Sequence, residues 1–139
     1  MPNHQEILEI QTRGRGMFDI SSQIDAIVRR SEVRTGLVSV FCQHTSCSLL
    51  IMENADPTAR QDLEAWLERL APDGDPHYTH DAEGPDDMSA HLRMALTRTH
   101  ETIPIAASRL LLGTWQGLFL CEHRTSPHRR RLVVTVVGS

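Results

Sequence analysis

The stretch GLVSVFCQH at residues 36–44 decides the fold, because its side chains divide between two faces with the period of a β-strand. One face carries Val38, Val40, Cys42 and His44, and the other carries Leu37, Ser39, Phe41 and Gln43. The stretch RRLVVTVV at residues 130–137 is almost wholly apolar and β-branched, and it predicts a strand that closes the chain. Further strands are predicted at residues 5–12, 48–53, 102–107, 108–112 and 118–124.

Capping residues and apolar stripes predict helices between these strands. Asp19 or Ser21 caps the first helix, whose stripe consists of Ile20, Ile24, Ile27 and Val28. Asp56 and Pro57 start the second helix, whose stripe consists of Leu63, Trp66, Leu67 and Leu70. The third begins at Asp86 or Asp87 and runs to about Arg98, and its inner side is marked by Met88, Leu92, Ala95 and His91.

The order of these elements favours an α+β fold over an alternating α/β fold, because most strands follow one another with short connections. We expect antiparallel β-sheets with helices packed against them, in a single compact domain spanning residues 1–139. The segment GTWQG at residues 113–117 is a plausible hairpin connection between two strands. Pro104 places its strand at a sheet edge.

The composition excludes several classes of protein. The net charge is −4 at pH 7, which argues against nucleic-acid binding, and no segment is apolar enough to cross a membrane. The N-terminus has no signal-peptide pattern, and three cysteines cannot pair fully, so we expect a cytoplasmic protein with reduced thiols. All 14 basic residues are arginine, and the lack of lysine removes Schiff-base chemistry and a P-loop.

The stretch HDAEGPDDMSAH at residues 80–91 is the strongest functional signal, because two histidines bracket a Gly-Pro turn rich in carboxylates. We predict that His44, His80 and His91 bind a divalent metal ion and leave open positions for water or substrate. The alternative is that His44 and His91 are hydrogen-bonded core residues and that His80 belongs to a loop. A weaker alternative is a metal site that uses the thiolates of Cys42 and Cys47.

Two carboxylates are candidate catalytic residues. Asp87 lies four residues before His91, so it can orient the imidazole, or it can merely complement the helix N-terminus. Glu122 follows apolar residues on one strand face, which is typical of a general acid/base or of half of an arginine ion pair.

Candidate substrate-binding residues are less distinctive. Arg124 and Arg130 can bind a phosphorylated substrate through bidentate contacts, although adjacent arginines also occur at solvated strand edges. Thr45 and Ser46 can donate to a phosphate or an oxyanion, with turn capping as the default interpretation. Gln116 lies beside Trp115, where the pair can contact a flat ring or simply pack.

Several separate motifs resemble the YjbQ-like family. They are HTS at 44–46, ENADP at 53–57, HDAEGPDDM at 80–88, the segment from Ser108 through GTWQG at 113–117, and EHR at 122–124 followed by RR at 130–131. The match runs in order over nearly the whole chain. It implies a compact α+β fold that assembles as a homotrimer, with a site near the subunit boundary.

The resemblance also implies a secondary thiamine-phosphate synthase, which joins a pyrimidine pyrophosphate to a thiazole phosphate and releases pyrophosphate. In that scheme the metal and the arginines stabilise the departing pyrophosphate. Pyrophosphate chemistry usually prefers magnesium, whereas three imidazoles prefer zinc, nickel or iron, and zinc is the ion that we expect first. The alternatives are another metal-assisted reaction, such as hydrolysis, and a non-catalytic trimer that binds a metal or a small ligand.

Overall fold

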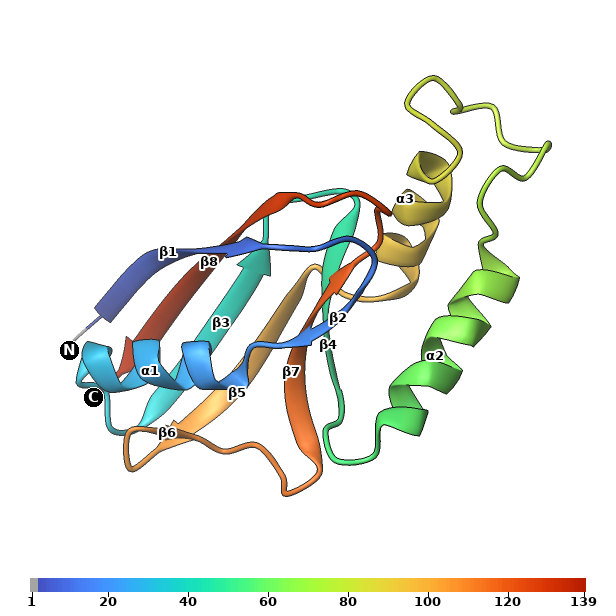
Figure 1. The fold of residues 1–139 in the computed structure, drawn as a ribbon. Coiled ribbons are helices and arrows are strands. Elements are labelled where there is room, and N and C mark those ends of the chain that lie inside the picture. Colours follow the sequence, from blue (N-terminus) through green and yellow to red (C-terminus); the bar gives the residue numbers. More distant parts are fainter. Residues whose placement is uncertain (1–2) are drawn as a thin grey trace.

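Two antiparallel sheets and three helices make up the computed structural model, which describes residues 3–139 (Figure 1). The larger sheet has the strand order β1 (Asn3–Gln11), β8 (Arg129–Gly138), β3 (Gly36–Cys42), β5 (His100–Ala106) and β6 (Arg109–Leu110). The smaller sheet has the order β2 (Gly16–Asp19), β7 (Gln116–Glu122) and β4 (Cys47–Glu53). The helices are α1 (Ser21–Ser31), α2 (Pro57–Leu70) and α3 (Asp87–Leu96). The predicted α+β class is confirmed.

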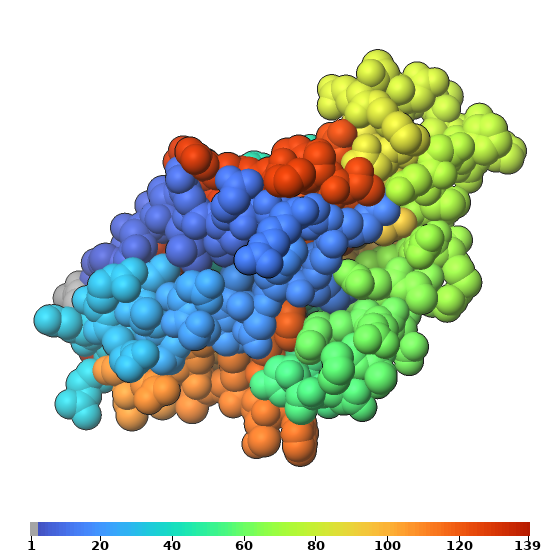
Figure 2. Space-filling model, viewed as in Figure 1, coloured from blue at the N-terminus to red at the C-terminus, as the bar shows by residue number. Residues whose placement is uncertain are grey.

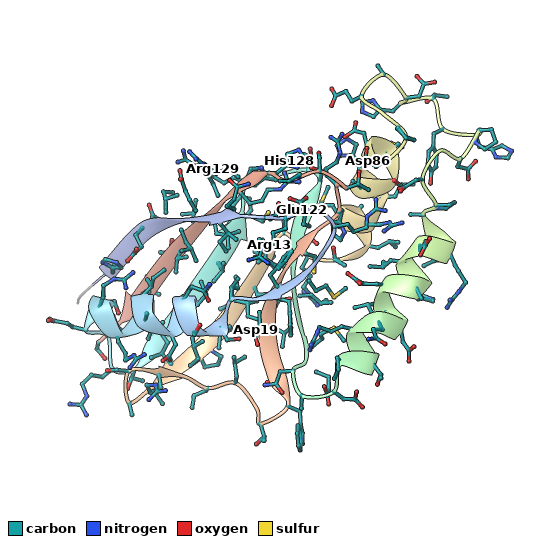
Figure 3. The ribbon with its side chains drawn as sticks, in the orientation of Figure 1. Arg13, Asp19, Asp86, Glu122, His128 and Arg129 are labelled. Carbon is teal, nitrogen blue, oxygen red and sulfur yellow. The ribbon has the colours of Figure 1, made fainter. Side chains whose placement is uncertain are left out.

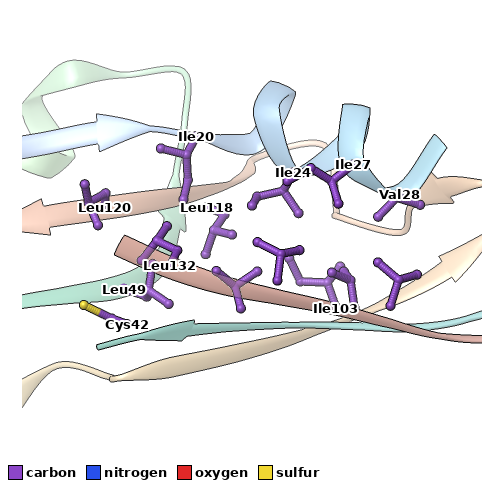
Figure 4. Close-up of a cluster of buried hydrophobic side chains, with 14 of the residues drawn as sticks. Ile20, Ile24, Ile27, Val28, Cys42, Leu49, Ile103, Leu118, Leu120 and Leu132 are labelled. Carbon is purple, nitrogen blue, oxygen red and sulfur yellow. The ribbon is translucent and has the colours of Figure 1, made fainter. Parts of the chain in front are cut away.

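The apolar core lies between α1 and the strands that it crosses (Figures 1 and 4). The stripe predicted for α1 is buried there, together with the inward residues of β3 and β8, and the cluster includes Ile24, Val28, Val40, Leu132 and Val136. β3 and β8 approach closely at Gly36, where an added Cβ would lie 2.0 Å from the carbonyl oxygen of Val137. The period-two pattern of residues 36–42 therefore indicated the correct buried face.

The apolar stripe predicted for α2 is wrong in part. Asp56 caps the helix as predicted, since its side chain accepts from the Thr58 N–H at 3.0 Å. However, Leu67 is the one buried residue of α2, whereas Trp66 and Leu70 are about half exposed. The reason is that α2 lies at the periphery, beside the smaller sheet, and does not cross the core (Figure 1).

The inner side predicted for α3 is also wrong. Met88 and Leu92 are half-buried and Ala95 is exposed, whereas the buried side contains Asp87, Ser89, Ala90 and Arg93. Polar residues can occupy this side because each finds a partner: for example, Arg93 donates to the Ala71 carbonyl oxygen at 3.0 Å.

The predicted hairpin around residues 113–117 does not form. β6 pairs with β5 in the larger sheet, whereas β7 pairs with β2 and β4 in the smaller sheet, so the segment connects two sheets. The short strand β2, which begins at Gly16, was not among the predicted strands. β5 is not the edge strand that Pro104 predicted, because it lies between β3 and the short β6, and the carbonyl oxygen of Pro104 accepts from the Leu111 N–H at 2.9 Å.

None of the helices in the described residues is both long enough and apolar enough to cross a membrane.

Candidate metal centre

His80, Asp87 and His91 form a cluster in which one potential ligand atom from each residue lies within 4.8 Å of the others. The Nε2 atom of His80 lies 2.8 Å from Oδ2 of Asp87, and the Nε2 atom of His91 lies 3.2 Å from the same oxygen. The two rings lie 5.3 Å apart. The connection before α3 supplies His80, and the first turns of α3 supply Asp87 and His91, because residues four apart share a helix face.

The ring of His91 is oriented by a backbone carbonyl. Its Nδ1 lies 2.7 Å from the carbonyl oxygen of Thr45, and because that oxygen only accepts, Nδ1 must carry the hydrogen. In the neutral imidazole the lone pair is then on Nε2, the atom that faces Asp87. A ring held in this way by a carbonyl oxygen is typical of histidines that bind metals.

Asp87 is almost fully buried and is held from its other side by Arg124, whose Nη1 donates to Oδ1 at 2.9 Å. Arg124 also donates through Nε to Asp86 at 3.0 Å. Burial raises the pKa of the Asp86 carboxyl, but Arg124 and Thr125 outweigh burial and keep this pKa well below its usual range. Arg124 therefore serves to hold two carboxylates at the start of α3.

The structure does not bring His44 into the cluster. β3 ends at Cys42, and the chain then turns so that Nε2 of His44 accepts from the Arg131 backbone N–H at 2.8 Å. Burial and the nearby Arg130 lower the pKa of His44, which favours the neutral ring that this hydrogen bond requires. The predicted set of three histidines is therefore corrected, with Asp87 in the place of His44.

Glu122 and Arg130 form a buried ion pair, the second of the two interpretations of Glu122. The side chains of Glu122 and Arg130 are 0% and 5% exposed, and Nε of Arg130 donates to Oε1 at 2.8 Å. Glu122 also accepts from the Thr12 hydroxyl at 2.7 Å and from the Arg124 N–H at 3.2 Å. Burial raises the pKa of Glu122, but Arg130 and Thr12 outweigh it and hold this pKa below its usual range.

This ion pair lies at the end of β7, whereas Asp86 lies beside the start of α3 (Figure 3). The guanidinium of Arg130 hydrogen-bonds to the Glu122 carboxylate and also to Ser46, whose hydroxyl accepts from Nη2 at 3.0 Å. Arg130 therefore does not present a free guanidinium to a ligand, contrary to the substrate-binding prediction.

The remaining predicted residues have structural partners. Thr45 contributes its backbone carbonyl to His91, and Ser46 is buried against Arg130. The side-chain oxygen of Gln116 accepts from the Gly113 N–H at 2.8 Å, which closes a turn. Gln116 and Glu122 stand at opposite ends of β7, which places them about 20 Å apart. Gln116 therefore lies at the end of β7 opposite to the one followed by Arg124, the arginine that contacts Asp87.

A cavity of about 320 Å³ lies beside His80. Its walls come mainly from the connection between α2 and α3, which projects from one end of the molecule (Figures 1 and 2). The lining residues are Gly74, Asp75, Pro76, Tyr78, His80, Asp81, Gly84, Pro85 and Met88. Sequence reasoning missed this cavity, because Tyr78 and the residues around it carry no periodic pattern.

A family model described as "UPF0047 protein YjbQ-like" matches residues 6–139. The chain belongs to this family. A UPF0047 protein of Synechocystis sp. is 53% identical over 135 residues, which cover 97% of this chain and 92% of that protein. The YjbQ protein of Escherichia coli O157:H7 is 37% identical over 136 residues, which cover 97% of this chain and 98% of that protein.

Solved structures of similar proteins share the fold. A conserved hypothetical protein from Thermus thermophilus is 37% identical, with a TM-score of 0.85, and the match covers 95% of this YjbQ-like chain and 99% of that one. A protein from Sulfolobus solfataricus is only 20% identical but has a TM-score of 0.86, with 99% of each chain covered. The latter likeness shows the fold alone.

The comparisons overturn the expected activity. The matching family and the relatives above carry only the designation UPF0047 or YjbQ-like, and the Sulfolobus solfataricus structure is described as a protein of unknown function. None of these descriptions indicates a thiamine-phosphate synthase. The resemblance to the YjbQ-like family is therefore confirmed, whereas the inference from it to thiamine-phosphate synthesis is wrong.

Proposed function

We propose that this YjbQ-like protein binds one divalent transition-metal ion through His80, Asp87 and His91. Two imidazoles and one carboxylate are a common ligand set of zinc sites that keep an open position. The same set is a poor match for magnesium, which prefers oxygen ligands and retains several waters. Zinc is therefore the ion that we expect.

The observation that carries this proposal is the convergence of two imidazole nitrogens on one carboxylate oxygen. Nδ1 of His91 already donates to Thr45, so a neutral His91 presents a lone pair to Oδ2 of Asp87, 3.2 Å away. Two lone pairs at that separation repel each other unless a positive charge lies between them. A metal ion bound by both atoms supplies that charge, as would a proton on Nε2.

The surroundings support the same proposal. Arg124 donates to Oδ1 of Asp87, the oxygen that does not face the histidines, and so fixes the orientation of the carboxylate. This is the role expected of a group that orients a metal ligand. The cavity beside His80 provides space next to the ion's remaining positions. That the protein is an enzyme, and that it is cytoplasmic, both remain predictions.

Metal content per chain tests the proposal, measured by mass spectrometry after incubation with zinc and removal of the excess. We expect about one equivalent in the wild type and a loss of most of it in Asp87→Asn. His77→Ala is the matched control, because His77 lies in the same connection with its side chain 92% exposed. Equal zinc in the wild type and in folded Asp87→Asn would refute the proposal.

We also propose that the protein is a homotrimer, assembled through the outer face of the larger sheet. Two groups of cross-strand neighbours on this face are apolar: Ile7 and Phe41 flank the half-buried Val133, and Leu37 lies opposite Val137. Their exposed fractions are 42% for Ile7, 47% for Phe41, 46% for Leu37 and 40% for Val137. A polar row made of Gln5, Thr135 and Ser39 separates the two groups. Exposed apolar groups of this kind commonly mark protein–protein contacts.

A further inference from the structure

The cavity beside His80 is lined by two carboxylates and by apolar surface, and His80 is the one basic side chain in its walls. Asp75 and Asp81 contribute carboxylates, while Tyr78, Pro76 and Met88 contribute apolar surface. No arginine lines the cavity, and the chain contains no lysine. A phosphate group entering this space would meet carboxylates without a counter-ion.

Two arginines that contact this connection are already paired with carboxylates, and a third, Arg93, is buried and donates to the Ala71 carbonyl oxygen. Arg124 donates to Asp86 and Asp87, as described above. Arg15 forms a bidentate pair with Asp73, with N–O distances of 2.8 and 2.9 Å. Because both guanidinium groups are engaged, neither is free to turn towards a phosphate in the cavity.

The two carboxylates of the cavity differ in their partners. Asp81 is exposed and forms no ion pair within residues 3–139. Asp75 accepts from the backbone N–H and the ring of His77, and these hydrogen bonds lower the pKa of Asp75, so that it stays ionised.

Tyr78 adds an aromatic surface to the same cavity. Its hydroxyl donates to the Pro72 carbonyl oxygen at 2.9 Å, which satisfies the polar end of the side chain and holds the ring in place. An aromatic ring beside carboxylates is a typical environment for an ammonium group, since the ring face attracts cations.

We propose that this cavity binds a small cationic molecule, and not a phosphorylated one, next to the metal centre. The inference specifies the ligand class of the proposed metal site and rests on that proposal for the neighbouring ion. It also replaces the phosphorylated substrate that the arginines had suggested. An amine with an apolar body fits the combination of Asp81, Tyr78 and Met88.

Two aromatic probes of opposite charge test the proposal: benzyltrimethylammonium and phenyl phosphate. Each is titrated into metal-free, isotope-labelled protein, and amide shifts are followed at Gly74, Gly84 and Met88. The metal-free state prevents phosphate from binding through an ion, and the quaternary ammonium cannot coordinate a metal. We expect benzyltrimethylammonium to shift these amides and to bind at least tenfold more tightly than phenyl phosphate.

Asp81→Asn should weaken binding of the ammonium probe about fourfold, the factor for one unit charge about 5 Å away in water. Asp62→Asn is the control, since Asp62 is an exposed aspartate on α2 outside the cavity, and it should leave the affinity unchanged. Equal or tighter binding of phenyl phosphate, or no shift at the lining residues with either probe, would overturn the proposal.

The same titration separates this inference from the metal proposal. With one equivalent of zinc added, we expect the ammonium probe still to shift Gly74 and Gly84, but with lower affinity, because an ion bound by His80 adds positive charge beside the cavity. Asp81→Asn should lower that affinity further. If zinc fails to bind but the ammonium probe binds, the metal proposal alone is refuted. If zinc binds and the ammonium probe does not, the ligand class is refuted and the metal centre stands.

Discussion

Replacing Arg130 with methionine removes the counter-ion of a carboxylate that is almost fully buried. Glu122 would keep the Thr12 hydroxyl and the Arg124 N–H, but it would lose both contacts to the guanidinium. Breaking one side of a buried ion pair typically costs about 3–5 kcal/mol, because the remaining charge is left uncompensated. For a chain of this length, such a loss lowers Tm by about 10–15 °C.

The assay is urea unfolding at pH 7, followed by circular dichroism at 222 nm. Arg131→Met is the matched control, because Arg131 is an exposed neighbour whose side chain forms no ion pair within the described residues. The control should lie within about 0.5 kcal/mol of the wild type. The double variant Glu122→Gln/Arg130→Met should recover part of the loss, since it no longer buries an unpaired charge. A loss below about 1 kcal/mol in Arg130→Met would refute the reasoning and restore Arg130 as a candidate ligand residue.

Burial and packing lead to three further predictions. Burial and nearby arginines lower the pKa of His123 from 6.5 to about 3. Between these two pH values the unfolded chain binds a proton that the folded protein excludes, so the free energy of unfolding falls as the pH falls. Between pH 6.5 and pH 5 this proton uptake lowers the free energy of unfolding by about 2 kcal/mol. Unfolding measured at pH 7 and pH 5 should show that His123→Gln loses about 2 kcal/mol less than the wild type over this range. Phe41→Lys should convert the proposed trimer to smaller species in light scattering. Trp66→Lys, which changes an equally exposed apolar residue on α2, should leave the mass unchanged; a trimer in both variants would contradict the proposed face. Gly36→Ala should lower Tm more than Gly113→Ala, because its Cβ would meet backbone and not a flexible side chain; equal Tm values would contradict the close approach of β3 and β8.

Periodic apolar patterns predicted the elements that pack against the core. Val38 and Val40 are buried as the pattern of residues 36–42 indicated, and the stripe of α1 that includes Ile24 is buried too. The same method failed for α2, where Trp66 is half exposed, because an apolar stripe does not specify the distance of a helix from the core. Assignment of β6 and β7 to different sheets depends on long-range pairing, which local turn signals do not contain.

The candidate site was predictable only where its residues are close in sequence. Asp87 and His91 lie four apart on a helix, so their proximity follows from helix geometry. The position of His44 depends on where β3 ends and on a hydrogen bond to Arg131, which is distant in sequence. Likewise, Arg124 and Arg130 looked available in the sequence because their carboxylate partners are identified only by the tertiary fold.

The zinc dissociation constant of His91→Ala, compared with that of His44→Ala, tests the central claim most directly. Both variants remove one imidazole, but only His91 belongs to the cluster with His80 and Asp87. The account predicts at least tenfold weaker zinc binding in His91→Ala, and binding close to that of the wild type in His44→Ala. Equal weakening in both folded variants, or none in His91→Ala, would contradict the proposed centre.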